Sequence, residues 1–261
     1  MTIAVCAPWP WGRLFGVFPP GIDFEENAVI LAADTRFSNE VRTLDNGRKI
    51  YLVAPNMALV YSGRVWTAQR GISDLFRAIR RCGDKRLAIV ERTLGEFFLR
   101  AHDKQLKPID KRRLKNGLPL RVLVGSIGPD GQPVCFRYSS QWTPRFDPFY
   151  VQGVSAIGDE RAASIVLNVL KRRMEERWQS GDLPVNPRDW QVDVVVAIQQ
   201  ALVDTGRSRS VGGTVQSVVV MKDRVEEQMF SMAEGDPMDE ASWRPLTDST
   251  ARLRPQDRPI G

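Results

Sequence analysis

Apolar and polar positions divide the chain into strand-like and helix-like segments in a definite order. Short apolar or alternating runs predict strands at 2–6, 27–36, 49–54, 57–63, 120–127, 133–139, 149–158, 214–222 and 224–232. Apolar residues at helical spacing predict helices at 65–81, 86–102, 159–178 and 189–205. Because pairs of helices alternate with groups of strands, the order favours two packed sheets with a helical layer outside each, over a doubly wound parallel sheet.

Turn and capping residues agree with several of these boundaries. Pro55-Asn56 and the segment 128–132 (GPDGQ) are turn signals between neighbouring strands, and Asp223 lies between the last two predicted strands. Asp159 directly precedes the third predicted helix, and Asp is a favoured N-cap residue. The chain therefore contains hairpins, which indicates antiparallel pairing.

Length and composition fit one domain with a long loop and a tail. Of the 261 residues 43% are hydrophobic, and residues 1–232 contain every predicted element, so we expect a single domain there. Residues 7–27, rich in Pro, Gly and aromatic side chains, predict an inserted ordered loop, and 233–261 predict a polar C-terminal tail. No apolar run approaches the ~20 residues of a membrane helix. The start lacks the basic residues of a secretory signal, so we expect a cytoplasmic protein.

Histidine and cysteine are scarce, and this narrows the chemistry. Cys6, Cys82 and Cys135 form no C-x-x-C pair, so we expect neither a disulfide framework nor a thiolate zinc site. The single histidine, His102, ends a predicted helix, where an exposed structural residue is the ordinary case. No glycine-rich phosphate or dinucleotide motif occurs. We therefore expect no metal and no cofactor, and an enzyme that works without imidazole unless His102 is itself the base.

The net charge of +6 permits nucleic-acid binding but does not indicate it. Basic residues gather at 77–86, 104–115 and 171–178, without an interleaved aromatic platform on which bases could stack. Solvated helix faces and one basic loop account for these clusters, so a nucleic-acid partner is not favoured.

Thr2, Asp34 and Lys49 are the candidates for catalysis. Removal of Met1 would make Thr2 the first residue, with a hydroxyl nucleophile and an α-amine of pKa ~7.7–8.0 as its own base. Asp34 ends an apolar strand and would need a cation once buried, and Lys49 begins another strand. A lysine ammonium near the Thr2 hydroxyl would favour its deprotonation. The alternative is an ordinary buried ion pair beside a threonine of no special role.

Five segments along the chain carry a family resemblance. They are TIAV (2–5), AVILAADTR (28–36), NGRKIYLVAPNMALVYSG (46–63), VSAIGDERAA (154–163) and VGGTVQSVVV (211–220). These segments resemble proteasome-type β subunits of the N-terminal nucleophile hydrolases. The resemblance implies an α+β fold, a four-layer αββα sandwich.

The resemblance also implies a role for individual residues and for assembly. Thr2 would be the nucleophile, Asp34 and Lys49 its activating pair, Arg36 a neighbouring structural charge, and the backbone N–H of Gly63 an oxyanion donor. The partners implied are a homo-oligomeric ring that encloses the site and a peptide or unfolded-protein substrate. Whether an ATPase or another regulator delivers that substrate is left open.

The chain departs from the family pattern at its supporting residues. Asp159 stands where active members carry a serine, and Ser208 and Val211 stand where they carry an Asp and a Ser; Asp159 or Ser210 could compensate. The segment 7–27 occupies a connection that is normally a short hairpin. We expect a threonine-type peptidase or amidohydrolase. The first alternative is a non-catalytic assembly subunit of the same fold, and the second is a basic nucleic-acid binder.

The resemblance also places one aromatic residue near the expected site, and we predict no specificity from it. By the same resemblance, Tyr61 would lie near the substrate side-chain pocket and narrow it.

Overall fold

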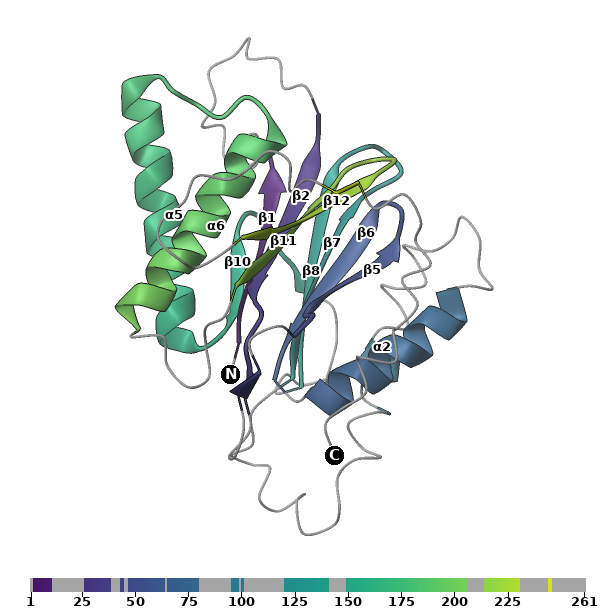
Figure 1. The fold of residues 1–261 in the computed structure, drawn as a ribbon. Coiled ribbons are helices and arrows are strands. Elements are labelled where there is room, and N and C mark those ends of the chain that lie inside the picture. The colour runs from purple at the N-terminus through teal and green to yellow at the C-terminus, as the bar shows by residue number, and fades with distance from the viewer. Residues whose placement is uncertain are drawn as a thin grey trace.

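The computed structural model of the protein contains both strands and helices (Figure 1). It describes residues 2–10, 26–38, 43–44, 47–63, 65–79, 95–98, 100, 120–140, 149–205, 214–230 and 244–245. In chain order the elements are β1 (Ile3–Trp9), β2 (Ala28–Asp34), β3 (Phe37–Ser38), β4 (Thr43–Leu44), β5 (Ile50–Ala54), β6 (Met57–Ser62), α2 (Val65–Ile79), β7 (Arg121–Ile127), β8 (Pro133–Ser139), β9 (Phe149–Tyr150), β10 (Ser155–Gly158), α5 (Glu160–Ser180), α6 (Pro187–Asp204), β11 (Val215–Val220), β12 (Val225–Phe230) and β13 (Arg244–Pro245).

Two antiparallel sheets pack face to face. Among the described residues, the first has six strands in the order β10-β1-β2-β11-β12-β13, and the second has five in the order β5-β6-β7-β8-β9 (Figure 1). Between them lies a hydrophobic layer that includes Ala4, Leu31 and Val218 of the first sheet and Val60 and Leu123 of the second. Because successive side chains of a strand point to opposite faces, every second residue of the central strands enters this layer.

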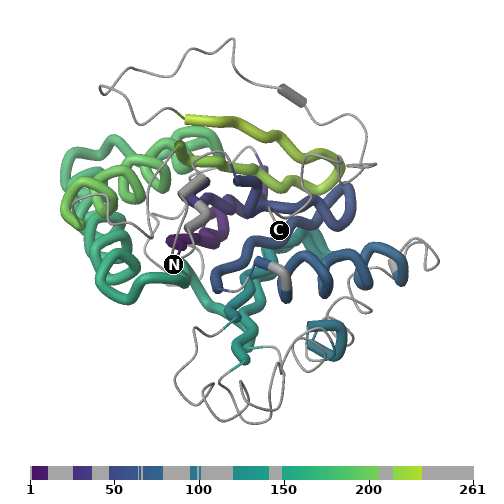
Figure 2. The backbone as a smooth tube through the Cα atoms, turned by 60° about the horizontal axis from the view of Figure 1, so that its bottom comes forward, coloured from purple at the N-terminus to yellow at the C-terminus, as the bar shows by residue number. Residues whose placement is uncertain are grey.

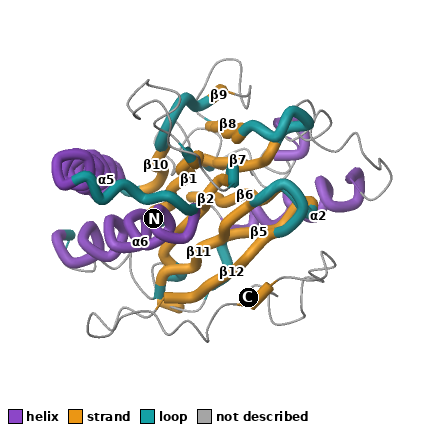
Figure 3. The backbone as a smooth tube through the Cα atoms, turned by 90° about the horizontal axis from the view of Figure 1, so that it is seen from above, coloured by secondary structure: helices purple, strands orange, loops and turns teal. Residues whose placement is uncertain are grey.

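The described helices pack unequally on the two sheets, with α5 and α6 on the first and α2 on the second (Figure 3). On the first sheet, Trp190 of α6 joins Val5 and Ile30 in one buried cluster, to which α5 also contributes. On the second sheet, Ile72 of α2 packs in a cluster with Leu59. The apolar faces predicted for these three helices are therefore buried, as expected. No helix in the described ranges is long and apolar enough to cross a membrane.

The predicted four-layer αββα sandwich, with paired long helices outside each sheet, is wrong. The described residues form a mixed α/β structure with unequal sheets of six and five strands and an additional ribbon of β3 and β4. The first sheet carries the pair α5 and α6, whereas beside the second the described helical residues are α2, 95–98 and 100. The predicted helix 86–102 is thus described only in that short part. Apolar periodicity identifies the face that a helix buries, but not how many helices a sheet receives.

β1 is longer than the predicted strand 2–6 and includes the start of the predicted loop 7–27. Trp9 pairs with Ala28 of β2 across the sheet. Its side chain is fully buried beside Trp190, with the ring centroids 6.5 Å apart. The beginning of the aromatic loop is therefore part of the core, and residues 11–25 lie outside the described part of the chain.

The predicted strand 149–158 is in fact two strands that belong to different sheets. Tyr150 of β9 pairs with Phe136 in the second sheet, whereas Ile157 of β10 pairs with Ala4 in the first. Gly153 lies between them with φ of +95°, a conformation that glycine adopts readily. The chain crosses between the sheets here, and an apolar run gives no sign of such a crossing.

Candidate functional site

The candidate site lies where β1 begins and β2 ends, near the start of β5. β1 and β2 lie side by side between the helices α5 and α6 and the second sheet (Figure 2). Lys49 Nζ donates a hydrogen bond to Asp34 Oδ1 at 3.0 Å, and neither side chain is exposed. The backbone N–H of Ile3 donates to the same oxygen at 2.8 Å. Asp34 therefore ties Lys49 to the residue that follows Thr2.

Because this ion pair is buried, the loss of either partner would destabilise the fold strongly. Moving two charges out of water is costly, and their mutual attraction offsets that cost only while both partners are present. Asp34 Oδ1 accepts from two donors, one charged and one backbone amide, so this oxygen is well satisfied. The arrangement holds the ammonium of Lys49 at a defined place without help from solvent.

Thr2 itself is buried, with 6% of its surface exposed, and its backbone is held from the opposite strand. The Asp159 N–H donates to the Thr2 carbonyl oxygen at 2.9 Å. Gly158 has φ of +121°, and a Cβ added there would lie 1.5 Å from the Thr2 carbonyl oxygen. Only glycine permits this approach, so Gly158 fixes the position of Thr2 from a distant part of the chain.

The carboxylate of Asp159 is used to cap helix α5. Its Oδ1 accepts from the Ala162 N–H at 3.0 Å, which confirms the predicted N-cap. Asp159 thus supports Thr2 through its backbone N–H, while its side chain satisfies the helix terminus.

The structure describes some of the remaining predicted site residues and not others. Arg36 is half-buried two residues after Asp34. Gly63 is half-buried directly after β6, with φ of +115°, and its role as oxyanion donor stays a prediction. Ser208 and Ser210 lie outside the described residues. The structure therefore brings Thr2, Asp34, Lys49 and Asp159 together around the start of β1.

Tyr61 is buried in the hydrophobic core between α2 and the second sheet. It is 1% exposed, belongs to the cluster under α2, and its ring centroid is 6.1 Å from that of Tyr51. The expectation that Tyr61 lies near a substrate pocket and narrows it stays a prediction. Alternation along β6 sends Tyr61 to the side of the sheet opposite to that of Val60.

Sequence reasoning missed a set of polar residues, Gln216, Thr35 and Thr214, that form hydrogen bonds around the ion pair. Gln216 of β11 accepts hydrogen bonds from the backbone N–H groups of Lys49 and Ile50, each at 3.2 Å. Thr35, next to Asp34, exchanges hydrogen bonds with Thr214: its N–H donates to the Thr214 carbonyl and its hydroxyl accepts from the Thr214 N–H. A signal was present, because Gln216 is an amide in the apolar run VQSVVV.

The described cysteines are not candidates for the nucleophile. Cys6 and Cys135 are free and buried, with their sulfur atoms 3.0 Å apart across the two sheets. Burial raises the pKa of the Cys6 thiol, and the neighbouring Cys135 thiol adds to this effect. A raised pKa keeps the thiol protonated and unreactive. Cys82 and His102 lie outside the described ranges. Within those ranges, no group of three or more His, Cys, Asp or Glu residues could hold a metal ion.

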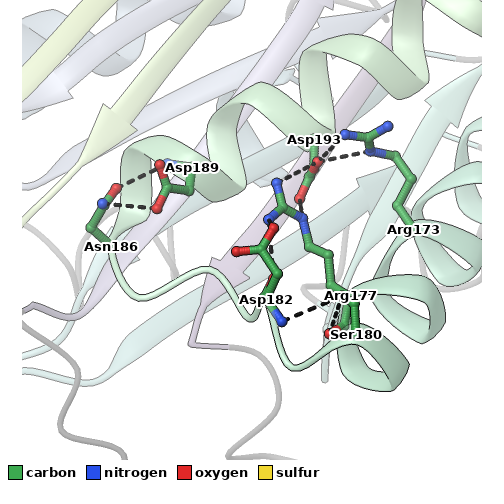
Figure 4. A network of polar contacts seen from close by, with 7 residues as sticks. All are labelled: Arg173, Arg177, Ser180, Asp182, Asn186, Asp189 and Asp193. Atoms are coloured by element: carbon green, nitrogen blue, oxygen red, sulfur yellow. Dashed lines mark hydrogen bonds and ion pairs between the residues drawn. The ribbon is translucent and has the colours of Figure 1, made fainter.

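A second polar network, away from this site, joins the two helices on the first sheet (Figure 4). The fully buried Asp193 of α6 receives Arg173 at 2.6 Å and Arg177 at 2.8 Å, both from α5. At the start of the basic segment 171–178, Lys171 and Arg172 form exposed ion pairs with acids one turn away. This cluster therefore serves helix packing and a solvated surface, whereas 104–115 and 80–86 lie outside the described residues.

Comparisons with known proteins do not assign this chain to a family. No protein-family model matches this chain, and no curated protein matches it. The resemblance to proteasome-type β subunits accordingly stays a prediction.

Proposed function

We propose that this protein is a threonine-type peptidase or amidohydrolase that uses Thr2 as its nucleophile after removal of Met1. The observation that carries the proposal is the buried Lys49–Asp34 ion pair, whose carboxylate also accepts the backbone N–H next to Thr2. A fixed ammonium and a held backbone at one threonine are what such a nucleophile requires.

The proposed reaction is acyl transfer in two steps. The Thr2 hydroxyl oxygen attacks the carbonyl carbon of the substrate amide, and the α-amine of Thr2 accepts the hydroxyl proton. The N–H of Gly63 donates to the oxyanion that forms. The proton passes to the leaving amine as the C–N bond breaks, which leaves an ester on Thr2. Water then attacks this ester, the acid product departs, and the Thr2 hydroxyl is restored.

Lys49 and Asp34 act on the first step. A lysine ammonium stabilises the negative charge that develops on the hydroxyl oxygen during attack, and its effect is larger where water is excluded. Asp34 keeps the ammonium in place, since the carboxylate and ammonium are both fully buried. This division of labour requires no imidazole.

The assembly and surroundings are part of the same proposal. A homo-oligomeric ring in the cytoplasm would enclose the site and admit peptides or unfolded chains, delivered by an ATPase or another regulator where one is present. No cofactor, metal or nucleic acid has a part in this chemistry. The support for the ring is the sequence resemblance.

The decisive experiment combines intact mass with covalent labelling. Mass spectrometry of the purified protein should show loss of Met1, and a peptide β-lactone, which acylates hydroxyl nucleophiles, should add once, at Thr2. Thr2→Ala should abolish labelling and peptide hydrolysis, whereas Thr2→Ser, which keeps the hydroxyl and amine, should retain both. A retained Met1, or undiminished hydrolysis by Thr2→Ala, would contradict the proposal.

One observation favours a second candidate, a non-catalytic assembly subunit. The Asp159 carboxylate caps α5 and so does not take the place of the serine expected there. This candidate predicts a defined oligomer in which Thr2 is not labelled, and sedimentation together with the labelling experiment separates the two functions.

A further inference from the structure

Gln216 is a buried amide on the inner face of the first sheet, close to the candidate site. It is 2% exposed, and it alternates with Val218 and Val220, which belong to the layer between the sheets. A buried amide must be hydrogen-bonded to be tolerated in such a layer. Its partners therefore show what this polar residue does there.

Its carbonyl oxygen holds the backbone at Lys49. Oε1 accepts from the N–H groups of Lys49 and Ile50, each at 3.2 Å. β5 is the edge strand of the second sheet in the described structure, so its outward N–H groups lack a strand neighbour there. Gln216, from the opposite sheet, supplies the acceptor that such a neighbour would provide. β11 and β5 lie close together in Figure 3.

The amide nitrogen of Gln216 is held in turn by the charged side chains of Glu227 and Arg48. Nε2 donates to Glu227 Oε1, and the other carboxylate oxygen of Glu227 pairs with Arg48 at 3.1 Å. Arg48 Nε donates back to the Ile50 carbonyl at 3.2 Å. These contacts settle which end of the amide faces Lys49, because Glu227 accepts only from the NH₂ group.

Gln216 also lies beside the other member of the ion pair. Its backbone pairs with Ala33 on β2, and the preceding residue, Val215, pairs with Asp34. β11 thus borders Asp34 through the backbone of Val215 and holds the backbone of Lys49 through the side chain of Gln216.

We propose that Gln216 is the positioning residue for Lys49, and that it sets the distance between the lysine ammonium and the Thr2 hydroxyl during attack. This inference rests on the proposed function. Gln216 touches the backbone of Lys49 rather than the substrate, so it acts through Lys49. A displaced ammonium stabilises the developing oxyanion less, and displacement by about 1 Å can slow such a reaction up to about 100-fold.

The test compares two buried glutamines that receive the same substitution. Gln216→Met removes the hydrogen bonds from the Lys49 and Ile50 N–H groups to Gln216 Oε1, which we call the clamp. The control, Gln191→Met, removes a fully buried amide whose Nε2 donates to Ser217 Oγ, on the neighbouring residue of β11, at 3.0 Å. Gln216→Glu keeps an acceptor but faces Glu227, and Gln216→Glu combined with Glu227→Gln exchanges donor and acceptor. Two measurements are made: labelling of Thr2 by a peptide β-lactone against pH, per folded molecule, and amide hydrogen exchange at Lys49 and Ile50.

The expected pattern distinguishes positioning from folding. Gln216→Met should slow labelling about 10- to 100-fold, move the half-maximal pH of labelling upward and accelerate hydrogen exchange at the Lys49 and Ile50 amides. Gln191→Met should leave the labelling rate, its half-maximal pH and the exchange unchanged. Gln216→Glu should slow labelling, and the exchange of donor and acceptor should restore most of the rate. If Gln216→Met does not fold, the two glutamate variants decide the matter by themselves.

Three outcomes would overturn the inference. Gln216 variants that label at the wild-type rate and pH exclude a positioning role, as does an equal loss in Gln191→Met. Unchanged exchange at Lys49 and Ile50 would exclude the clamp itself, whether or not the protein is an enzyme. Absence of labelling in the wild-type protein with Met1 removed would refute the proposed function and the positioning role with it, while the exchange data still decide whether the clamp exists.

Discussion

The Lys49 ammonium lies 3.0 Å from the Asp34 carboxylate, and neither side chain reaches solvent. Asp34 ends a strand of the first sheet, and Lys49 directly precedes a strand of the second. The ion pair therefore joins the two sheets at one edge of the layer between them. Its position couples the stability of the fold to the geometry of the candidate site.

Loss of Lys49 should destabilise the fold strongly. Lys49→Met is expected to lower the free energy of unfolding by about 3–5 kcal/mol, because it leaves a buried carboxylate without its cation. Urea denaturation measures this change, and Lys49→Met combined with Asp34→Asn should recover part of it. As a control, Arg70→Ala breaks the exposed pair of 3.7 Å with Asp74 and should cost less than about 1 kcal/mol. Equal effects of Lys49→Met and Arg70→Ala would contradict the buried-pair interpretation.

Gly158 should tolerate no side chain. A Cβ there would lie 1.5 Å from the Thr2 carbonyl oxygen, so Gly158→Ala must push β1 away from β10. Gly181→Ala is the matched control, since Gly181 also has positive φ, +74°, but nothing within 4 Å of an added Cβ. The control should cost about 1–2 kcal/mol for the left-handed conformation alone. Thermal unfolding should show a clearly larger loss for Gly158→Ala, and labelling of Thr2 should fall only in that variant.

Alkaline pH should weaken the fold through Cys6. Burial raises the pKa of its thiol, so the folded protein keeps a proton that the unfolded chain releases. This contribution is complete below the unfolded pKa of ~8.5 and is lost as pH rises from there towards the folded pKa, by up to about 1.4 kcal/mol per pH unit. Cys6→Ala should therefore show a shallower decline of unfolding free energy above pH ~8.5. Parallel curves for Cys6→Ala and the wild-type protein would refute this linkage.

The two arginines on Asp193 should act as one unit. Arg173→Met or Arg177→Met leaves the other guanidinium on the buried carboxylate, whereas the double variant leaves Asp193 without either. The double variant should therefore lose more stability than the sum of the single losses, by roughly 0.5–3 kcal/mol of coupling. A double-mutant cycle in urea measures this term, and additive losses would contradict it. Labelling of Thr2 per folded molecule should be unchanged, because this network lies on the helices.

Several features of the site could be predicted because they depend on local sequence. Asp34 was recognisable as a carboxylate at the end of an apolar strand, Lys49 as a cation at the start of another, and Asp159 as an N-cap. The structure confirms the pair and the cap. Gln216 was overlooked because an amide in a strand shows no partner in its own neighbourhood, and the Lys49 N–H that it accepts lies 167 residues away.

The sequence by itself determined most of the longer strands, three of the long helices and the faces they bury, since these follow from the spacing of apolar residues and from caps and turns. Tertiary structure decided which sheet each described helix packs on, which sheet receives β9 and which receives β10, and that Tyr61 faces the core under α2. It also brought Gly158 against Thr2 and Gln216 against Lys49. The physical reason is that these contacts join residues far apart in the chain. Their choice depends on how whole faces pack, which no local pattern specifies.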